Sequence, residues 1–422
     1  MSRFDFTALL ESELQPALGV TEIGAIALAS ARAADAADGS PLRIRLTLSG
    51  GVYKNAFSCA IPGTRGRGCE MAAVLGVLGG DWSLGLECLK NITQDHVKEA
   101  KELGIPVEVI VDESKENVYV QADVRTTKAL GIVRIEDLHD NITYVAKNDI
   151  VIFDGNHASK TESATFDFDT VTVADFVAYV KSVPIWRLDF IKNMIDMNCK
   201  LAEEGEKGVG LNVWKTLTAF QKKGELGNDM ITEAQRLTCS AMDARLAGLP
   251  FPAMGIVGSG SHGILCSLPV VSYGRFSGAT EEEIIRAVAL SGLITIYSKH
   301  YTGRLSALCG CVLGGGSGAA GGIVLLMGGG AREVSAAIDH MAANLTGMIC
   351  DGGSIGCVLK TSAGVSAAYL SAMLAVKEIE IPHRFGVVGS TVEQTTRNLG
   401  RISEEGLSAM DRTIIDIMQK GL

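Results

Sequence analysis

The pattern of apolar and polar positions divides the chain into three stretches. Residues 3–37 have helical spacing, with the alanine-rich run EIGAIALASARAADAA as its clearest part and Gly39-Ser40-Pro41 as its end. Between residues 42 and 153, alternating or β-branched runs predict strands. After about residue 170 the strand signals stop, and segments with helical spacing alternate with glycine-rich loops. We therefore predict an α+β fold.

The middle stretch begins with LRIRLTLS (42–49), whose period-two alternation is typical of a half-buried strand. A glycine-rich loop follows, then two helical segments at about 68–79 and 82–103. Short β-branched runs between Val107 and Phe153, separated by turn residues, predict a meander of antiparallel hairpins.

Three domains follow from this reading. Residues 1–38 form an N-terminal helix that packs on the helical domain. Residues 39–168 form an α+β domain with an antiparallel sheet, inserted after that helix. Residues 169–422 form a large all-helical domain.

Composition supports large buried cores with closely packed helices. Of 422 residues, 47% are hydrophobic and 49 are glycine, while only 5% are aromatic. The net charge is −10 and no basic run is present, which excludes nucleic acid as an expected partner. The first residues contain acids and no continuous apolar run, so we expect no export, a cytoplasmic location and reduced cysteines.

The stretch Leu308–Gly330 carries no charge over 23 residues, and its length alone would permit a membrane span. Ten of these residues are glycine, and no second span of similar quality exists. We predict a buried, closely packed helix and no membrane association. The glycine-rich apolar surface is compatible with a homodimer.

Three cysteines are candidate metal ligands. Cys350 and Cys357 flank the loop DGGSIG, and Cys309 lies at the start of the apolar helix. Thiolates suit iron, and glycines let the backbone fold closely around an iron–sulfur cluster. Three protein ligands would leave one iron open as a Lewis acid. The alternative is three core cysteines, and Cys311 competes with Cys309, since residues two apart on a helix point to different faces.

The segment GIVGSGSHGI (255–264) is a second candidate site. Ser259, Gly260 and Ser261 are suited to hold a carboxylate or phosphate through amides and hydroxyls, and His262 is a candidate acid or base. An ordinary loop between helices is the alternative.

Further candidates are scattered along the chain. Lys54 and Asn55, in the glycine-rich loop, are suited to a substrate carboxylate, although an exposed turn explains them equally. Cys59 lies in the same polar loop. Glu22 follows Thr21 as in a helix cap, and Lys299 precedes the first candidate ligand in a polar cluster that fits either a pocket mouth or the surface.

Taken in order, PALGVTE, KN…IPGT, GSGS, RLSALC and GMICDG with a cysteine seven positions after the first resemble the L-cysteine desulfidase family, which is related to the α chain of iron–sulfur L-serine dehydratases. The resemblance implies a [4Fe-4S] lyase without pyridoxal phosphate that removes the β-substituent of a small L-amino acid. L-Cysteine would give pyruvate, ammonia and sulfide. The family's cluster ligands fall on Cys309, Cys350 and Cys357.

One position departs from this family. Its early motif reads Cys-Thr-Glu-Pro, with the cysteine taken as the base, whereas Val20 stands here. Valine cannot accept a proton, so His262, Cys59, Lys54 or Glu22 would have to serve, or the substrate differs. The rival hypothesis is a cluster-free or degenerate paralogue that binds a small ligand.

Overall fold

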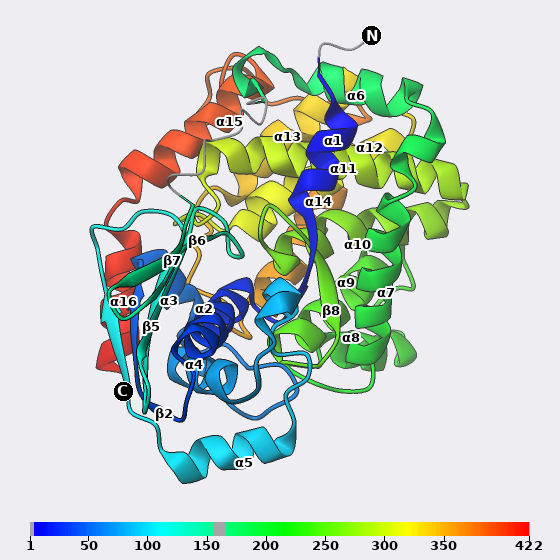
Figure 1. Ribbon diagram of the computed structural model, residues 1–422. Helices are drawn as coiled ribbons and strands as arrows, with labels where there is room; N and C mark the ends of the chain where they lie inside the picture. The colour runs from blue at the N-terminus through cyan, green and yellow to red at the C-terminus, as the bar shows by residue number, and fades with distance from the viewer. Residues whose placement is uncertain (1–3, 156–165, 422) are drawn as a thin grey trace.

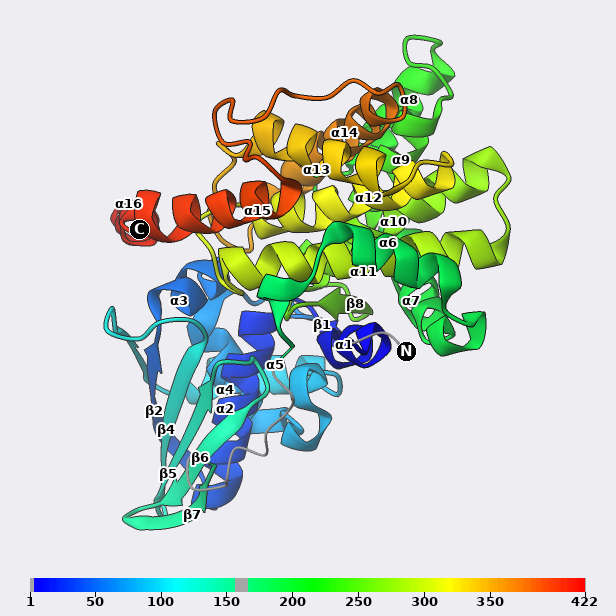
Figure 2. The same cartoon turned by 90° about the horizontal axis from the view of Figure 1, so that it is seen from above.

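The computed structural model describes residues 4–155 and 166–421, and it divides into a sheet region and a larger helical region (Figure 1). The view from above shows the sheet with its helices on one side of the molecule and a layer of helices on the other (Figure 2). The predicted α+β class is confirmed. The three domain ranges stay a prediction, and residues 156–165, next to the boundary expected at 168, lie outside the described residues.

The main sheet has six strands in the order β3-β2-β4-β5-β6-β7. Its strands are β2 (Pro41–Leu48), β3 (Val107–Val111), β4 (Tyr119–Thr126), β5 (Leu130–Glu136), β6 (Ile142–Lys147) and β7 (Ile150–Asp154). The strands from β4 to β7 form the predicted antiparallel meander. The prediction was wrong for β3, which runs parallel to β2, since helices α4 and α5 cross over between them.

Helix α2 (Thr21–Ala37) packs on β4, β5 and on α4 (Gly68–Gly79), so helices cover one face of the sheet (Figure 2). Small side chains permit this close packing. A Cβ added at Gly131 of β5 would lie 1.9 Å from the carbonyl oxygen of Ala33 on α2. The alanine-rich helix thus packs against the sheet, and not on the helical region as the sequence suggested.

The N-terminal stretch is not one helix. Helix α1 (Phe6–Glu13) contacts the helical region, and strand β1 (Leu14–Leu18) then pairs antiparallel with β8 (Pro252–Ile256). The predictions of a continuous helix over 3–37 and of an all-helical region after 169 were therefore wrong at these two strands. Each is five residues long, and its partner lies more than 200 positions away, so no local pattern marks it.

The helical region surrounds α10 (Gly260–Ser277), α11 (Glu281–Thr302) and α12 (Ser317–Leu326). The predicted apolar helix is buried. A Cβ at Gly318 or Gly322 of α12 would lie 2.3 or 2.7 Å from a carbonyl oxygen of α11. The other helices are α3 (Gly50–Ala56), α5 (Gln94–Leu103), α6 (Val173–Ser182), α7 (Ile191–Gly205), α8 (Val213–Lys222), α9 (Met230–Leu246), α13 (Ala331–Leu345), α14 (Cys357–Ala375), α15 (Val392–Arg401) and α16 (Met410–Lys420).

Within the described ranges, α14 is the one helix long and apolar enough to cross a membrane by length and composition, and half of its most apolar window is buried inside the protein. A core helix passes the same criterion, so this helix is weak evidence for a membrane span.

Candidate active site

A short two-stranded ladder brings Cys309 and Cys350 together. Leu308 and Ile349 form an antiparallel bridge, the Cys309 amide donates to the carbonyl of Met348 (2.9 Å), and the Cys350 amide donates to a carbonyl of the facing segment (2.7 Å). Residues that flank a bridged pair point to the face opposite that pair. Cys309 and Cys350 therefore share one face of the ladder although they are 41 positions apart in the sequence.

Cys357 is the first residue of α14, and it reaches the same place. One turn further, the ammonium of Lys360 donates to the carbonyl of Ile349 (3.0 Å) and pairs with Asp351. This lysine ties the start of α14 to the segment that carries Cys350. Cys309, Cys350 and Cys357 line one cavity of about 640 Å³, a volume that includes the solvent at its mouth.

Cys311 lines this cavity too, and its Sγ lies 3.4 Å from the Sγ of Cys309. The expectation that the two thiols point to different faces was wrong, because Cys309 precedes the helical turn and the helical period does not apply to it. Their mutual hydrogen bond lowers the pKa of Cys309 and raises that of Cys311. Burial raises the pKa of Cys350 and of Cys357.

The thiols on this wall are the type of donor that an iron–sulfur cluster takes. Within the described part of the chain, no group of three His, Cys, Asp or Glu side chains converges as the ligands of one metal ion do. Cluster thiolates bind different irons and need not meet at one point. Glycines keep the surrounding backbone close. A Cβ at Gly353 would lie 2.5 Å from Cys59 Sγ, and one at Gly352 would lie 2.5 Å from the Lys54 carbonyl oxygen.

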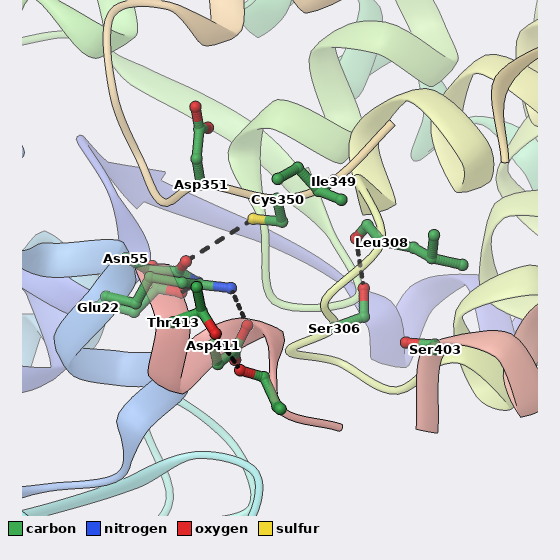
Figure 3. Close-up of polar contacts among 12 residues, drawn as sticks. Glu22, Asn55, Ser306, Leu308, Ile349, Cys350, Asp351, Ser403, Asp411 and Thr413 are labelled. Carbon is green, nitrogen blue, oxygen red and sulfur yellow. Dashed lines mark hydrogen bonds and ion pairs between the residues drawn. The ribbon is translucent and has the colours of Figure 1, made fainter. Parts of the chain in front are cut away.

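Glu22 and Asn55 face Cys350 across the cavity (Figure 3). The Asn55 amide donates to the Glu22 carboxylate (2.7 Å), and its oxygen lies 3.9 Å from Cys350 Sγ. His139, in the turn between β5 and β6, places Nε2 3.6 Å from the same carboxylate. Burial raises the pKa of Glu22, but His139 and Asn55 outweigh it and lower the pKa to about 2. Glu22 is thus a buried carboxylate that stays ionised.

The first turn of α10 forms another wall, through Ser259 and Ser261. The chain enters this turn through Val257, whose φ of 50° is rare for a β-branched residue. Such strained positions concentrate at functional sites. Ser259, the residue preceding α10, makes no side-chain capping bond, and the first amides of a helix have no intrahelical acceptor.

His262 and Lys299 meet beside Gly310. A Cβ at Gly310 would lie 2.7 Å from both His262 Nε2 and Lys299 Nζ. The Lys299 ammonium donates to Ser306 (3.1 Å). Burial lowers the pKa of Lys299 to about 8, although Cys350 and Cys309 oppose the shift. Burial and the charge of Lys299 lower the pKa of His262 well below its ordinary value, so this imidazole is neutral at neutral pH.

Three of the predicted site residues do not line the cavity, namely Lys54, Cys59 and Gly260. Lys54 and Asn55 lie on helix α3 rather than in a loop. Asn55 reaches the cavity, whereas Lys54 is buried with its ammonium 2.6 Å from Asp411 of α16. The Cys59 thiol is buried, with carbonyl oxygens of Asn55 and Gly353 each 2.7 Å away. Gly260, the first residue of α10, is not among the residues that line the cavity.

The sequence analysis missed Arg245, His139 and Lys360, which all line the cavity. Arg245 follows Asp243 by two positions in the helical segment SAMDARL, so in the sequence it looks like an ordinary surface charge. His139 stands in an ordinary hairpin turn, and Lys360 has the spacing of a surface lysine. Val20 also lines the cavity, beside Gly353.

A cavity that combines buried thiols, an ionised carboxylate, a neutral imidazole and buried cations is the kind of site that enzymes build. Residues 83–416 match the serine dehydratase alpha chain family, and the chain belongs to this family. The family associates the protein with serine dehydratase-like, lyase-type chemistry.

Close relatives extend over the whole chain. A UPF0597 protein of Clostridium botulinum strain Hall is 40% identical over 417 residues, covering 97% of each chain. A UPF0597 protein of Clostridioides difficile is 38% identical over 425 residues, covering 97% of this chain and 98% of its own. One from Caldanaerobacter subterraneus is 36% identical over 419 residues, covering 98% of both.

Proposed function

We propose that the protein is an iron–sulfur-dependent lyase that performs α,β-elimination on a small L-amino acid. L-Cysteine would give pyruvate, ammonia and sulfide, and an L-serine-like substrate would lose water in place of sulfide. The observation that carries the proposal is the convergence of Cys309, Cys350 and Cys357 on one cavity in a member of the serine dehydratase alpha chain family.

The same three cysteines would hold a [4Fe-4S] cluster, and the proposed reaction uses no pyridoxal phosphate. When bound, the cluster supplies a Lewis-acidic iron that polarises the β-leaving group. Three features support this assignment, because they hold the thiols on one wall with the backbone close around them. They are the bridge between Leu308 and Ile349, the hydrogen bond from Lys360 to the Ile349 carbonyl, and the glycines of the 350–357 loop.

His262 is the best candidate for the base that removes the Cα proton. Its Nε2 lies near Gly310 in the cavity, and burial keeps it neutral and able to accept a proton. Glu22 is a poor base, since its pKa is about 2. Cys59 is poor as well, since burial raises its pKa and two carbonyl oxygens adjoin its thiol. A base at position 262 would allow the reaction to proceed although Val20 replaces the cysteine that serves as the base in the resembled family.

Glu22 has a different role in this proposal. Among the described residues it is the one carboxylate on the cavity wall, and it is held ionised by Asn55 and His139. A fixed negative charge attracts the ammonium of an amino acid and orients the Cα–H bond.

The test is pyruvate release from L-cysteine and from L-serine by anaerobically prepared protein. We expect His262→Gln to lower kcat by about 10²- to 10⁴-fold while iron content stays unchanged. His96→Gln serves as the control, because His96 caps α5 far from the cavity and glutamine can form the same capping box.

The second candidate, a cluster-free paralogue that binds a small ligand, is favoured by Val20 on the cavity wall. It predicts wild-type protein that contains no iron and releases no pyruvate from either substrate. An iron-loaded wild-type protein that is active, with His262→Gln as active as His96→Gln, would keep the lyase and remove His262 as its base.

A further inference from the structure

Arg245 is a buried arginine that forms no ion pair with a carboxylate of residues 4–155 or 166–421. It lies in the last turn of α9, is 4% exposed, and lines the cavity. Its Nη1 donates to Ser261 Oγ (2.8 Å), whereas its buried Nε has no hydrogen-bond partner. Burial lowers the pKa of Arg245, and the charge of Glu22, which forms no ion pair with it in the described structure, opposes that shift. Burying a cation without a direct counter-ion is costly, so an anion bound beside Arg245 would be stabilising.

Two of the other cations on the wall are already paired with carboxylates. Arg304 pairs with Glu13 at 2.7 Å, and Lys360 pairs with Asp351. Lys299, like Arg245, bonds to a serine hydroxyl, that of Ser306, but it lies beside Gly310 on the side of the cysteines. Within the described part of the chain, Arg245 makes no ion pair, and the one wall carboxylate, Glu22, is already bound by Asn55. The counter-ion of Arg245 is therefore expected to enter with a ligand.

The local structure holds this guanidinium against the first turn of α10. A Cβ at Gly260 would lie 2.5 Å from Arg245 Nε, so only glycine leaves room for the side chain. Ser261 fixes the other end of the guanidinium plane. The free amides of the same helical turn carry partial positive charge. A carboxylate beside Ser261 could accept hydrogen bonds from both the guanidinium and these amides. Arginine is well suited to bind a carboxylate, because its planar group can donate two parallel hydrogen bonds.

We propose that Arg245 binds the α-carboxylate of the amino-acid substrate and that Ser261 orients its guanidinium. The proposal rests on the function proposed above and adds the residue that selects a carboxylate. It also assigns the two charges of the substrate to different walls of the cavity, with the ammonium toward Glu22 and the carboxylate toward α10.

The test compares two ligands that cannot eliminate, L-alanine and L-alaninamide, which differ only in the carboxylate. Binding to anaerobically prepared, iron-loaded protein is measured by calorimetry for wild type, Arg245→Met, Arg245→Lys and Arg236→Lys. Arg236 is the matched control, because it lies on the same helix and pairs with Glu233 away from the cavity.

Wild type and Arg236→Lys should bind L-alanine about 10- to 100-fold more tightly than L-alaninamide, the range expected for charge-assisted hydrogen bonds. Arg245→Met should lose this preference, and Arg245→Lys should keep part of it. In turnover assays Arg245→Met should raise KM more than it lowers kcat.

Two results would overturn the assignment. One is a wild-type protein that does not prefer L-alanine. The other is an Arg245→Met variant that keeps the preference, or loses both ligands equally, as a purely structural arginine would. Pyruvate release by wild type is measured separately, so a failure of the lyase proposal is distinguishable from a failure of the Arg245 assignment.

Discussion

At the scale of single residues, the site is organised by buried charges that neighbours hold in a fixed state. Glu22 is the clearest case, since it is 5% exposed and yet ionised. Its carboxylate accepts hydrogen bonds from Asn55 and Thr21 and faces His139. Because Glu22 is ionised in the folded protein, the free energy of unfolding depends on pH.

We expect Glu22→Gln to weaken the acid sensitivity of the protein. The folded-state pKa of Glu22 is about 2 against an ordinary value of 4.5. A depressed pKa contributes stability above pH 4.5 that is lost as the pH falls toward 2, at most about 3 kcal/mol. Unfolding free energies of wild type and variant, measured between pH 2 and 5, should therefore converge as the pH falls. Parallel curves would show that Glu22 is not held ionised.

The sequence pointed to cavity-lining residues where polar and thiol side chains were concentrated in a motif. The thiols of GMICDG and RLSALC and the serines of GSGS were named as candidates, and they line one cavity. Arg245 and His139 were missed, because each looks ordinary in its own segment. Only the tertiary structure shows that Arg245 forms no ion pair among the described residues and that His139 faces Glu22.

At the scale of elements, a two-stranded ladder and a helix start position the three candidate ligands. The loop between Cys350 and Cys357 must pass close to α3 and to Cys59. At Gly353 the space for a side chain is absent, whereas a Cβ at Gly356 would meet only Ser354 Oγ, at 3.4 Å. The two glycines form a matched pair for testing the loop.

We expect Gly353→Ala to displace the loop and to lower iron content to less than half of wild type, because its methyl would lie 2.5 Å from Cys59 Sγ and 2.9 Å from a carbonyl oxygen. Gly356→Ala, at φ −61° before α14, should retain iron. The measurement is iron per chain after anaerobic purification. Equal iron in both variants would show that the loop does not shape the metal site.

Elements defined by local periodicity were predictable, including β2, α4 and the meander from β4 to β7. Strands β1 and β8 were not, because neither has an amphipathic signature and each exists only through the other. Helix α3 looked like a loop because its sequence, GGVYKNA, opens with two glycines.

At the scale of the whole molecule, the cavity lies between the sheet region and the helical region. Its walls come from α2, α3 and the β5–β6 turn on one side and from α9, α10 and α11 on the other. The C-terminal helix α16 also packs on α3, at the edge of the molecule (Figure 2). The ion pair between Lys54 and Asp411 joins these two helices.

We expect Asp411→Asn to lower the melting temperature more than Lys54→Met. Lys54 is 1% exposed at its side chain and Asp411 is 30% exposed, so removing the acid leaves a buried ammonium without its counter-charge. The cost should be about 1–3 kcal/mol, below that of a fully buried pair because Asp411 meets water. Thermal unfolding of both variants and of the double variant checks this order, and the reverse order would contradict it.

The central claim is that Cys309, Cys350 and Cys357 hold an iron–sulfur cluster. Its most direct test is iron and acid-labile sulfide per chain in anaerobically purified protein. We predict about four of each in wild type and in Cys88→Ala, a buried core cysteine, and neither in a Cys350→Ser, Cys357→Ser double variant. Wild-type protein without iron, or a double variant with its full complement, would contradict the claim.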